Sequence, residues 1–223
     1  MTVNSILGFA DPFSSILHLL AAVVFCVLGF FLVAHGKGSF GRMFSLAVFA
    51  FSVVFLLSMS GVFHLLALGS TGRMVLQRLD HAGIFLLIAG SFTPLHSIMF
   101  TGFWRWGILA MVWILAITGI TLKSIFFDSI PEWLGLGIYL GMGWLGLISG
   151  ILLSRRLGLS FIKPLVYSGL AYSLGGITEF FSWPILIPGV IGPHEIFHVA
   201  VIVGIGIHWY FMYQCIDRAE KLP

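Results

Sequence analysis

Seven apolar stretches recur along the chain, and each is long enough to cross a lipid bilayer as a helix. One crossing takes about 20 predominantly apolar residues. The stretches cover residues 15–34, 43–68, 82–100, 105–125, 133–153, 161–182 and 195–215. Only 9% of the residues are charged, whereas soluble domains carry about 25%. The sequence therefore indicates an integral membrane protein.

The connections between the apolar stretches are short and carry turn or charge signals, such as Gly36-Lys37-Gly38 and the segment from Asp128 to Glu132. Short connections favour helices that pack as neighbours in one bundle. We therefore predict an all-α fold, a bundle of seven transmembrane helices that forms a single domain over residues 1–223.

An odd number of crossings determines which polar residues share a face of the membrane. The face of the N-terminus collects the beginnings of the first, third, fifth and seventh helices and the ends of the others. The polar residues placed there are Asp11, His18, Ser60, His64, Asp80, His81, Glu179, His194, Glu195 and His198. His35 and His96 fall on the opposite face, and we expect them, like His81, to be interfacial residues. The gathering of histidines near one face predicts a functional site.

Basic residues are distributed unevenly between the two faces. The N-terminal face holds Arg73, Arg78 and Lys123, and the opposite face holds Lys37, Arg42, Arg105, Arg155, Arg156, Lys163, Arg218 and Lys221. Cytoplasmic loops carry an excess of Lys and Arg. The charge distribution therefore predicts an external N-terminus and a cytoplasmic C-terminus.

His194 and His198 are four residues apart where the seventh stretch begins, directly after Pro193. Proline suits the first turn of a helix, and positions i and i+4 lie on one helical face. His64, near the end of the second stretch, lies at matching depth on the same side. Three neutral imidazoles leave the fourth position of zinc open, as in catalytic sites. We predict a zinc ion bound by His64, His194 and His198.

Asp80 and Ser60 are the candidate catalytic residues beside this metal. Asp80 could accept a proton from a zinc-activated water, and Ser60 could hold that water or a substrate carbonyl. Each has a simpler explanation. Asp80 could cap the start of the third helix, and Ser60 could bond back to a carbonyl of its own helix.

The string from His194 to His198 also fits the H-E-x-x-H pattern of zinc proteases, in which the glutamate is the general base. That interpretation assigns Glu195 to catalysis. The alternative is that Glu195 is an outward-facing residue at the helix start. Replacing Glu195 distinguishes the two, because a protease would lose its activity.

Four motifs together resemble the progestin and adipoQ receptor family, and within it the bacterial hemolysin III-like membrane proteins. They are Asp11 through His18, Ser60-x-x-x-His64, Leu79 through Ile84, and His194 through His198 followed by His208. The resemblance implies an adiponectin-receptor-like bundle with an intramembrane zinc on the three histidines and Asp80 contacting it through water. The chain departs from the family at Asp11, Ser14 and Leu17, where a glutamate, an asparagine and a threonine are usual.

The resemblance implies two functions of different class. One is zinc-dependent hydrolysis of a lipid amide or ester. The other is a receptor-like or membrane-homeostasis role with a structural zinc, since bacterial members are named for a haemolytic phenotype. We expect a lipid of the bilayer as substrate or ligand, a bacterial plasma-membrane location and no nucleic-acid partner. The sequence leaves the oligomeric state open, and it leaves the orientation open too, because the receptors place their N-terminus and zinc on the cytoplasmic side.

Overall fold

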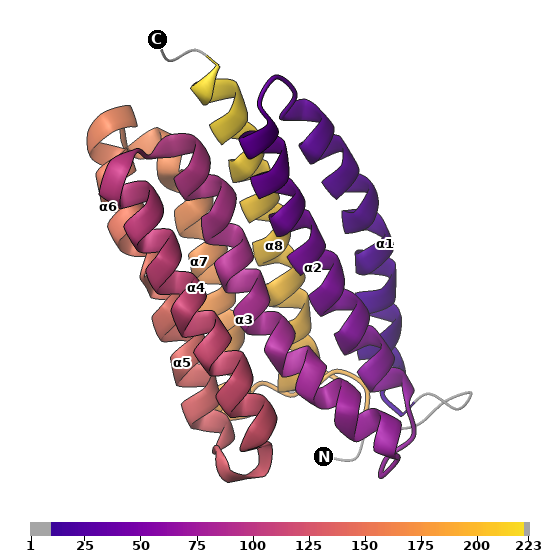
Figure 1. Ribbon diagram of the computed structural model, residues 1–223. Coiled ribbons are helices and arrows are strands. Elements are labelled where there is room, and N and C mark those ends of the chain that lie inside the picture. Colours follow the sequence, from indigo (N-terminus) through magenta and orange to yellow (C-terminus); the bar gives the residue numbers. More distant parts are fainter. Residues whose placement is uncertain (1–9, 221–223) are drawn as a thin grey trace.

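The computed structural model describes residues 10–220, and most of them lie in helices that run side by side (Figure 1). The helices are α1 (Pro12–His35), α2 (Phe40–Leu65), α3 (Thr71–Met99), α4 (Gly102–Ile125), α5 (Glu132–Trp144), α6 (Gly146–Leu157), α7 (Leu159–Phe181) and α8 (Pro193–Ala219), with a 3-10 turn η1 (Phe127–Ser129) after α4. Lys221, counted above among the basic residues, lies outside the described residues. The single domain over residues 1–223 stays a prediction.

The described chain makes seven crossings. α5 and α6 follow each other directly and form one crossing from Glu132 to Leu157. Counted in this way, six helices of the described residues are long and apolar enough to span a membrane. α7 supplies the seventh crossing with 23 residues, about 34 Å at 1.5 Å per residue, which exceeds a hydrocarbon core of about 30 Å. The predicted seven-helix membrane bundle is confirmed.

α3 begins earlier than its apolar stretch suggests. The sequence places the third crossing from residue 82, whereas the helix starts at Thr71, and the hydroxyl of Ser70 accepts a hydrogen bond from the Arg73 N–H at 3.2 Å. The added turns carry Arg73 and Asp80, so hydropathy alone does not detect them. Asp80 therefore lies about three turns into the helix, and Ser70 rather than Asp80 caps it.

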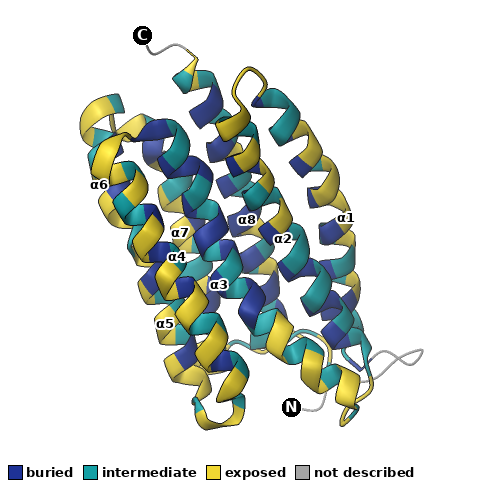
Figure 2. Cartoon of the chain, viewed as in Figure 1, coloured by how far each residue is buried: buried dark blue, intermediate teal, exposed yellow. Residues whose placement is uncertain are grey.

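Buried residues face the inside of the bundle and exposed apolar residues face outward (Figure 2). The main core holds Leu32, Phe49, Leu57, Phe211 and Ile216, each at most 1% exposed. Since lipid tails are as apolar as these side chains, close packing rather than the hydrophobic effect holds helices together inside a membrane. Small residues that allow close approach therefore matter, and Gly90 is one of them. A Cβ built on Gly90 of α3 would lie 2.3 Å from Oγ of Ser52 on α2.

The described helices alternate in direction, and their ends lie at the two faces as the odd number of crossings predicts. The ends of α2 and α7 and the beginnings of α1, α3 and α8 all lie at the lower end of the bundle in Figure 1, while the C-terminal end of α8 lies at the upper end. Short connections after α2 and before α8 thus bring residues far apart in sequence to one end.

Gly90 gives a test of the α2–α3 packing. We expect Gly90→Ala to destabilise the protein by about 1–3 kcal/mol, because an added methyl group overpacks a closed contact. Gly137→Ala is the matched control, since a Cβ there meets nothing within 4 Å and alanine is the better helix former by about 0.5–1 kcal/mol. Thermal unfolding in detergent should show a lower midpoint for Gly90→Ala only. Equal midpoints for the two variants would contradict the packing.

Candidate metal centre

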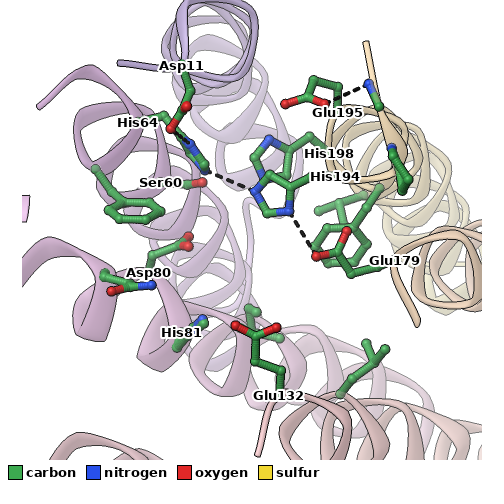
Figure 3. A pocket seen from close by; sticks show the side chains of 18 of the residues that line it. Asp11, Ser60, His64, Asp80, His81, Glu132, Glu179, His194, Glu195 and His198 are labelled. Carbon is green, nitrogen blue, oxygen red and sulfur yellow. Dashed lines mark hydrogen bonds and ion pairs between the residues drawn. The ribbon is translucent and has the colours of Figure 1, made fainter. Parts of the chain in front are cut away.

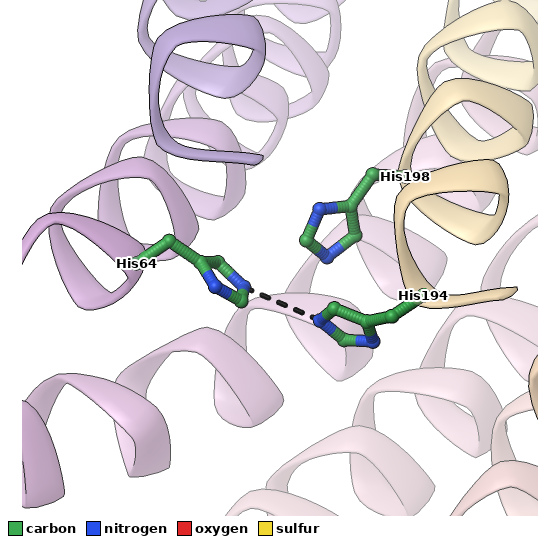
Figure 4. Close-up of side chains that lie close together, drawn as sticks. All are labelled: His64, His194 and His198. Carbon is green, nitrogen blue, oxygen red and sulfur yellow. Dashed lines mark hydrogen bonds between the residues drawn. The ribbon is translucent and has the colours of Figure 1, made fainter. Parts of the chain in front are cut away.

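Three histidines from two helices meet near the lower end of the bundle. His64 lies in the last turn of α2, and His194 and His198 lie in the first two turns of α8. One ring nitrogen of each lies within 4.8 Å of the corresponding nitrogens of the other two. Figure 4 shows the three rings turned toward a common centre. The structure thus brings together the three residues that the sequence predicts as metal ligands.

Two carboxylates set the proton positions on two of these rings. The Nδ1 of His64 lies 2.9 Å from Oδ2 of Asp11, and the Nδ1 of His194 lies 3.1 Å from Oε1 of Glu179. An ionised carboxylate only accepts hydrogen bonds, so each Nδ1 carries the proton and donates it. The Nε2 atom of each neutral ring then keeps a free lone pair.

These two Nε2 atoms face each other at 3.4 Å. Two lone pairs at that distance repel unless a cation lies between them. A shared proton would satisfy two nitrogens only, whereas the His198 ring lies close to both, with centroids 4.3 Å from His194 and 4.8 Å from His64. Three converging donors favour a metal ion over a proton.

The donor set fits zinc. In a tetrahedral zinc site with Zn–N bonds of about 2.0–2.1 Å, neighbouring nitrogens are about 3.3 Å apart, close to the 3.4 Å between His64 and His194. Neutral imidazoles are common zinc ligands, and three of them leave one position for water or substrate. His64, His194 and His198 are the residues that would hold the ion.

Asp11 stays ionised as the partner of His64. Burial raises its pKa, but hydrogen bonds from His64 and from Arg73, with the positive charge of Arg73, outweigh burial and lower the pKa to about 2. The carboxylate therefore remains an acceptor at neutral pH. Ligating histidines generally donate their second ring N–H to such a partner, which fixes the ring. The order of the crossings places Asp11 and Glu179 on this face, but the sequence does not show that they accept hydrogen bonds from the candidate ligands.

The third imidazole is oriented differently. The His198 ring stacks on His18 of α1, with centroids 4.1 Å apart and planes inclined at 33°. Both ring nitrogens of His18 and the Nδ1 of His198 are buried without a hydrogen-bond partner among the described residues. Packing against His18, rather than a carboxylate, fixes His198 in the fold.

Asp80 and Ser60 line the same chamber as the histidines (Figure 3). Ser60 lies one turn before His64 in α2 and is 1% exposed. Its Oγ has no hydrogen-bond partner in the described chain, so it does not bond back to its own helix. Both residues thus face the site that the sequence assigns to them.

Glu195 forms hydrogen bonds at the start of α8. Its Oε2 accepts a hydrogen bond from the Gly192 N–H at 2.8 Å, and its Oε1 accepts one from Ser14 Oγ at 3.3 Å. Figure 3 shows this carboxylate apart from the place where the three imidazoles converge. The side chain is 5% exposed, so the outward-facing position, one of the two alternatives for Glu195, is wrong.

The other histidines do not join the cluster. His96, expected at the interface, is fully buried, with Nδ1 2.5 Å from the Trp104 carbonyl and Nε2 2.9 Å from Ser149 Oγ. His35 pairs with Asp217 at 2.7 Å at the opposite end. His81 lines the chamber beside the Phe127 ring, while His208 lies deeper in the bundle, against Phe49. Both hydrogen bonds of His96 join it to other helices, so the order of the crossings alone does not predict that it is buried.

Two cavities adjoin the cluster. The chamber that holds the histidines has a volume of about 910 Å³ and also contains charged residues, among them Glu132 and Lys123. A second, mostly apolar cavity of about 440 Å³ lies among α3, α5, α6, α7 and α8. The two share wall residues, namely Leu56, Ile84, Leu136, Tyr139, Phe197 and Val201. A polar chamber therefore borders an apolar one beside the metal centre.

Comparison with known proteins identifies the family of the chain. Residues 9–209 match the family described as Haemolysin-III related. The chain is 33% identical over 162 residues to the Hemolysin-3 homolog of Bacillus subtilis (strain 168), covering 73% of this chain and 72% of that protein. It is 37% identical over 126 residues to Hemolysin-3 of Bacillus cereus, covering 56% of this chain and 54% of that protein. The match extends over most of the helices and includes all three cluster histidines, so the chain belongs to the haemolysin-III-related family of membrane proteins.

Proposed function

We propose that this protein is a zinc-dependent hydrolase of the membrane that cleaves a lipid amide or ester. The observation that carries the proposal is the pair of Nε2 atoms at 3.4 Å, each opposite an Nδ1 held by a carboxylate. That arrangement presents lone pairs to a cation, and it does so beside a chamber with room for a substrate. Enzyme sites of this kind are concave and have a few convergent polar groups.

Bound zinc would supply a water of lowered pKa and polarise the scissile carbonyl. Asp80 faces the chamber and would accept a proton from the water molecule whose oxygen attacks the carbonyl carbon. It would then pass that proton to the departing amine or alcohol. Ser60 would donate a hydrogen bond to the carbonyl oxygen through its unpartnered Oγ. The C–N or C–O bond breaks, leaving a fatty acid and the head of the lipid.

The second cavity supports a lipid substrate. Its walls are mostly aliphatic or aromatic, and it touches the metal chamber through shared residues such as Leu56 and Phe197. An acyl chain in this cavity would place its carbonyl end toward the histidines. We propose a lipid of the bilayer as substrate and the bacterial plasma membrane as location.

The competing proposal is a structural zinc. The three histidines join α2 to α8, so an ion bound there would hold two distant segments together. In that case the protein would be a receptor-like or membrane-homeostasis protein without turnover. Three protein donors would leave one coordination position of zinc free beside the chamber, and this favours the hydrolase.

The first prediction concerns the metal. We expect the purified protein to hold one zinc per chain and the triple variant His64→Ala, His194→Ala, His198→Ala to hold none, because all three donors are lost. His35→Ala, at the other end of the bundle, is the control and should keep its zinc. Elemental analysis of detergent-purified samples makes the measurement. Equal zinc in the triple variant and the control would refute the site.

The second prediction concerns turnover. Asp80→Asn should keep zinc but lose about 10²–10⁴-fold in the rate of lipid hydrolysis, because the proton acceptor is gone. Asp128→Asn is the matched control, since that carboxylate is 89% exposed. Release of fatty acid from a panel of lipid amides and esters is the assay. Zinc-loaded wild-type protein that cleaves no lipid class would establish the structural alternative.

The third prediction separates this mechanism from that of a zinc protease. Glu195→Gln should retain most lipid hydrolysis, because glutamine still accepts the hydrogen bond from the Gly192 N–H. A protease that used Glu195 as its base would instead lose nearly all activity. Abolished hydrolysis in a variant that still binds zinc would show that Glu195 takes part in the reaction.

A further inference from the structure

Arg73, in the first turn of α3, reaches the metal centre through Asp11. Its Nη2 donates a hydrogen bond to Oδ2 of Asp11 at 2.6 Å. The same oxygen accepts the Nδ1–H of His64 at 2.9 Å. The side chains of Arg73 and Asp11 are only 12% and 16% exposed. One carboxylate oxygen thus links a guanidinium to a candidate metal ligand.

The rest of the guanidinium holds the end of α2, where His64 lies. Nη1 of Arg73 donates to the carbonyl of Phe63 at 3.2 Å and to that of Leu66 at 2.7 Å. The guanidinium also lies 4.5 Å from the centre of the Phe63 ring. The planar fork of arginine can serve several acceptors at once, which the single ammonium of lysine does less well.

Asp11 is also fixed through its backbone. Its N–H donates to the carbonyl of His64 at 3.0 Å. The residue therefore contacts His64 twice, once through the main chain and once through the carboxylate. By contrast, the Glu179 partner of His194 is 35% exposed, and no arginine or lysine of the described residues forms an ion pair with it. Asp11, the partner of His64, is thus fixed by more contacts than Glu179, the partner of His194.

We propose that Arg73 is a positioning residue of the metal centre: it holds Asp11 so that His64 keeps the ring orientation and tautomer that present Nε2 to the metal. The inference rests on the metal site of the proposed function and not on hydrolysis. Loss of such an outer partner typically weakens metal binding about 10–100-fold. In the sequence, Arg73 stands out only as one of the basic residues of the N-terminal face.

The test compares Arg73→Gln with Arg78→Gln. Arg78 lies in the same helix, and its nearest ion-pair partner is the exposed Asp128 at 3.7 Å. Competition with a chelator should show an about 10–100-fold higher Kd for zinc in Arg73→Gln and an unchanged Kd in Arg78→Gln. The Kd for zinc of Arg73→Lys should lie between the values of these two variants, because one ammonium cannot donate to Asp11 and two carbonyls together.

Visible absorption of the Co²⁺-loaded proteins adds a readout that a purely structural role would not change. At saturating Co²⁺, Arg73→Gln should give altered ligand-field bands, since the His64 ring is no longer fixed, while Arg78→Gln should match wild type. Metal-free thermal midpoints report any general loss of stability. Zinc affinity and Co²⁺ spectra of Arg73→Gln equal to those of wild type would overturn the proposal.

Asp11→Asn provides a second variant in case Arg73→Gln does not fold. It removes the carboxylate and leaves the bonds from Arg73 to the α2 carbonyls in place, so it breaks the link from the other side. We expect the same loss of zinc affinity, and wild-type affinity in Asp11→Asn would equally overturn the proposal. Because the readout is metal binding, a lack of lipid turnover bears on the proposed hydrolase alone.

Discussion

The candidate metal centre depends on two hydrogen bonds that assign protons to imidazole rings. Asp11 and Glu179 each take an Nδ1–H, so the opposite nitrogens of His64 and His194 face each other with unshared electron pairs. Such a contact is unfavourable inside a bundle without a cation. His64 is 3% exposed, whereas the His194 side chain is 43% exposed and lines the chamber. The helices thus bring three nitrogen donors close enough together that they could hold a metal ion.

The bilayer accounts for how distant residues reach that centre. Backbone polar groups in lipid must be satisfied within each segment, so every crossing is a helix. Alternating crossings then sort helix ends between two faces, and residues of α2 and α8, more than a hundred positions apart, meet at one end. This is why the histidine cluster could be anticipated from seven apolar stretches and the spacing of His194 and His198.

What the sequence did not reveal are features that depend on tertiary contacts. The first turns of α3 carry Arg73 and Asp80 and interrupt the apolar pattern, so the helix start was placed about eleven residues late. The burial of His96 and the attachment of Glu195 to Gly192 and Ser14 depend on partners that spacing alone does not identify. The links from Arg73 through Asp11 to His64 connect α3, the residue that precedes α1, and α2, and no local motif encodes them.

The wall shared by the two cavities would also influence the products of the proposed hydrolysis. A lipid that occupied both cavities would be cleaved at the boundary between a charged compartment and an apolar one. Its two fragments would then differ in solubility and find different exits, the acyl fragment sideways into the membrane and the polar fragment toward water. Such separation would hinder their recombination and make the reaction directional without any moving part.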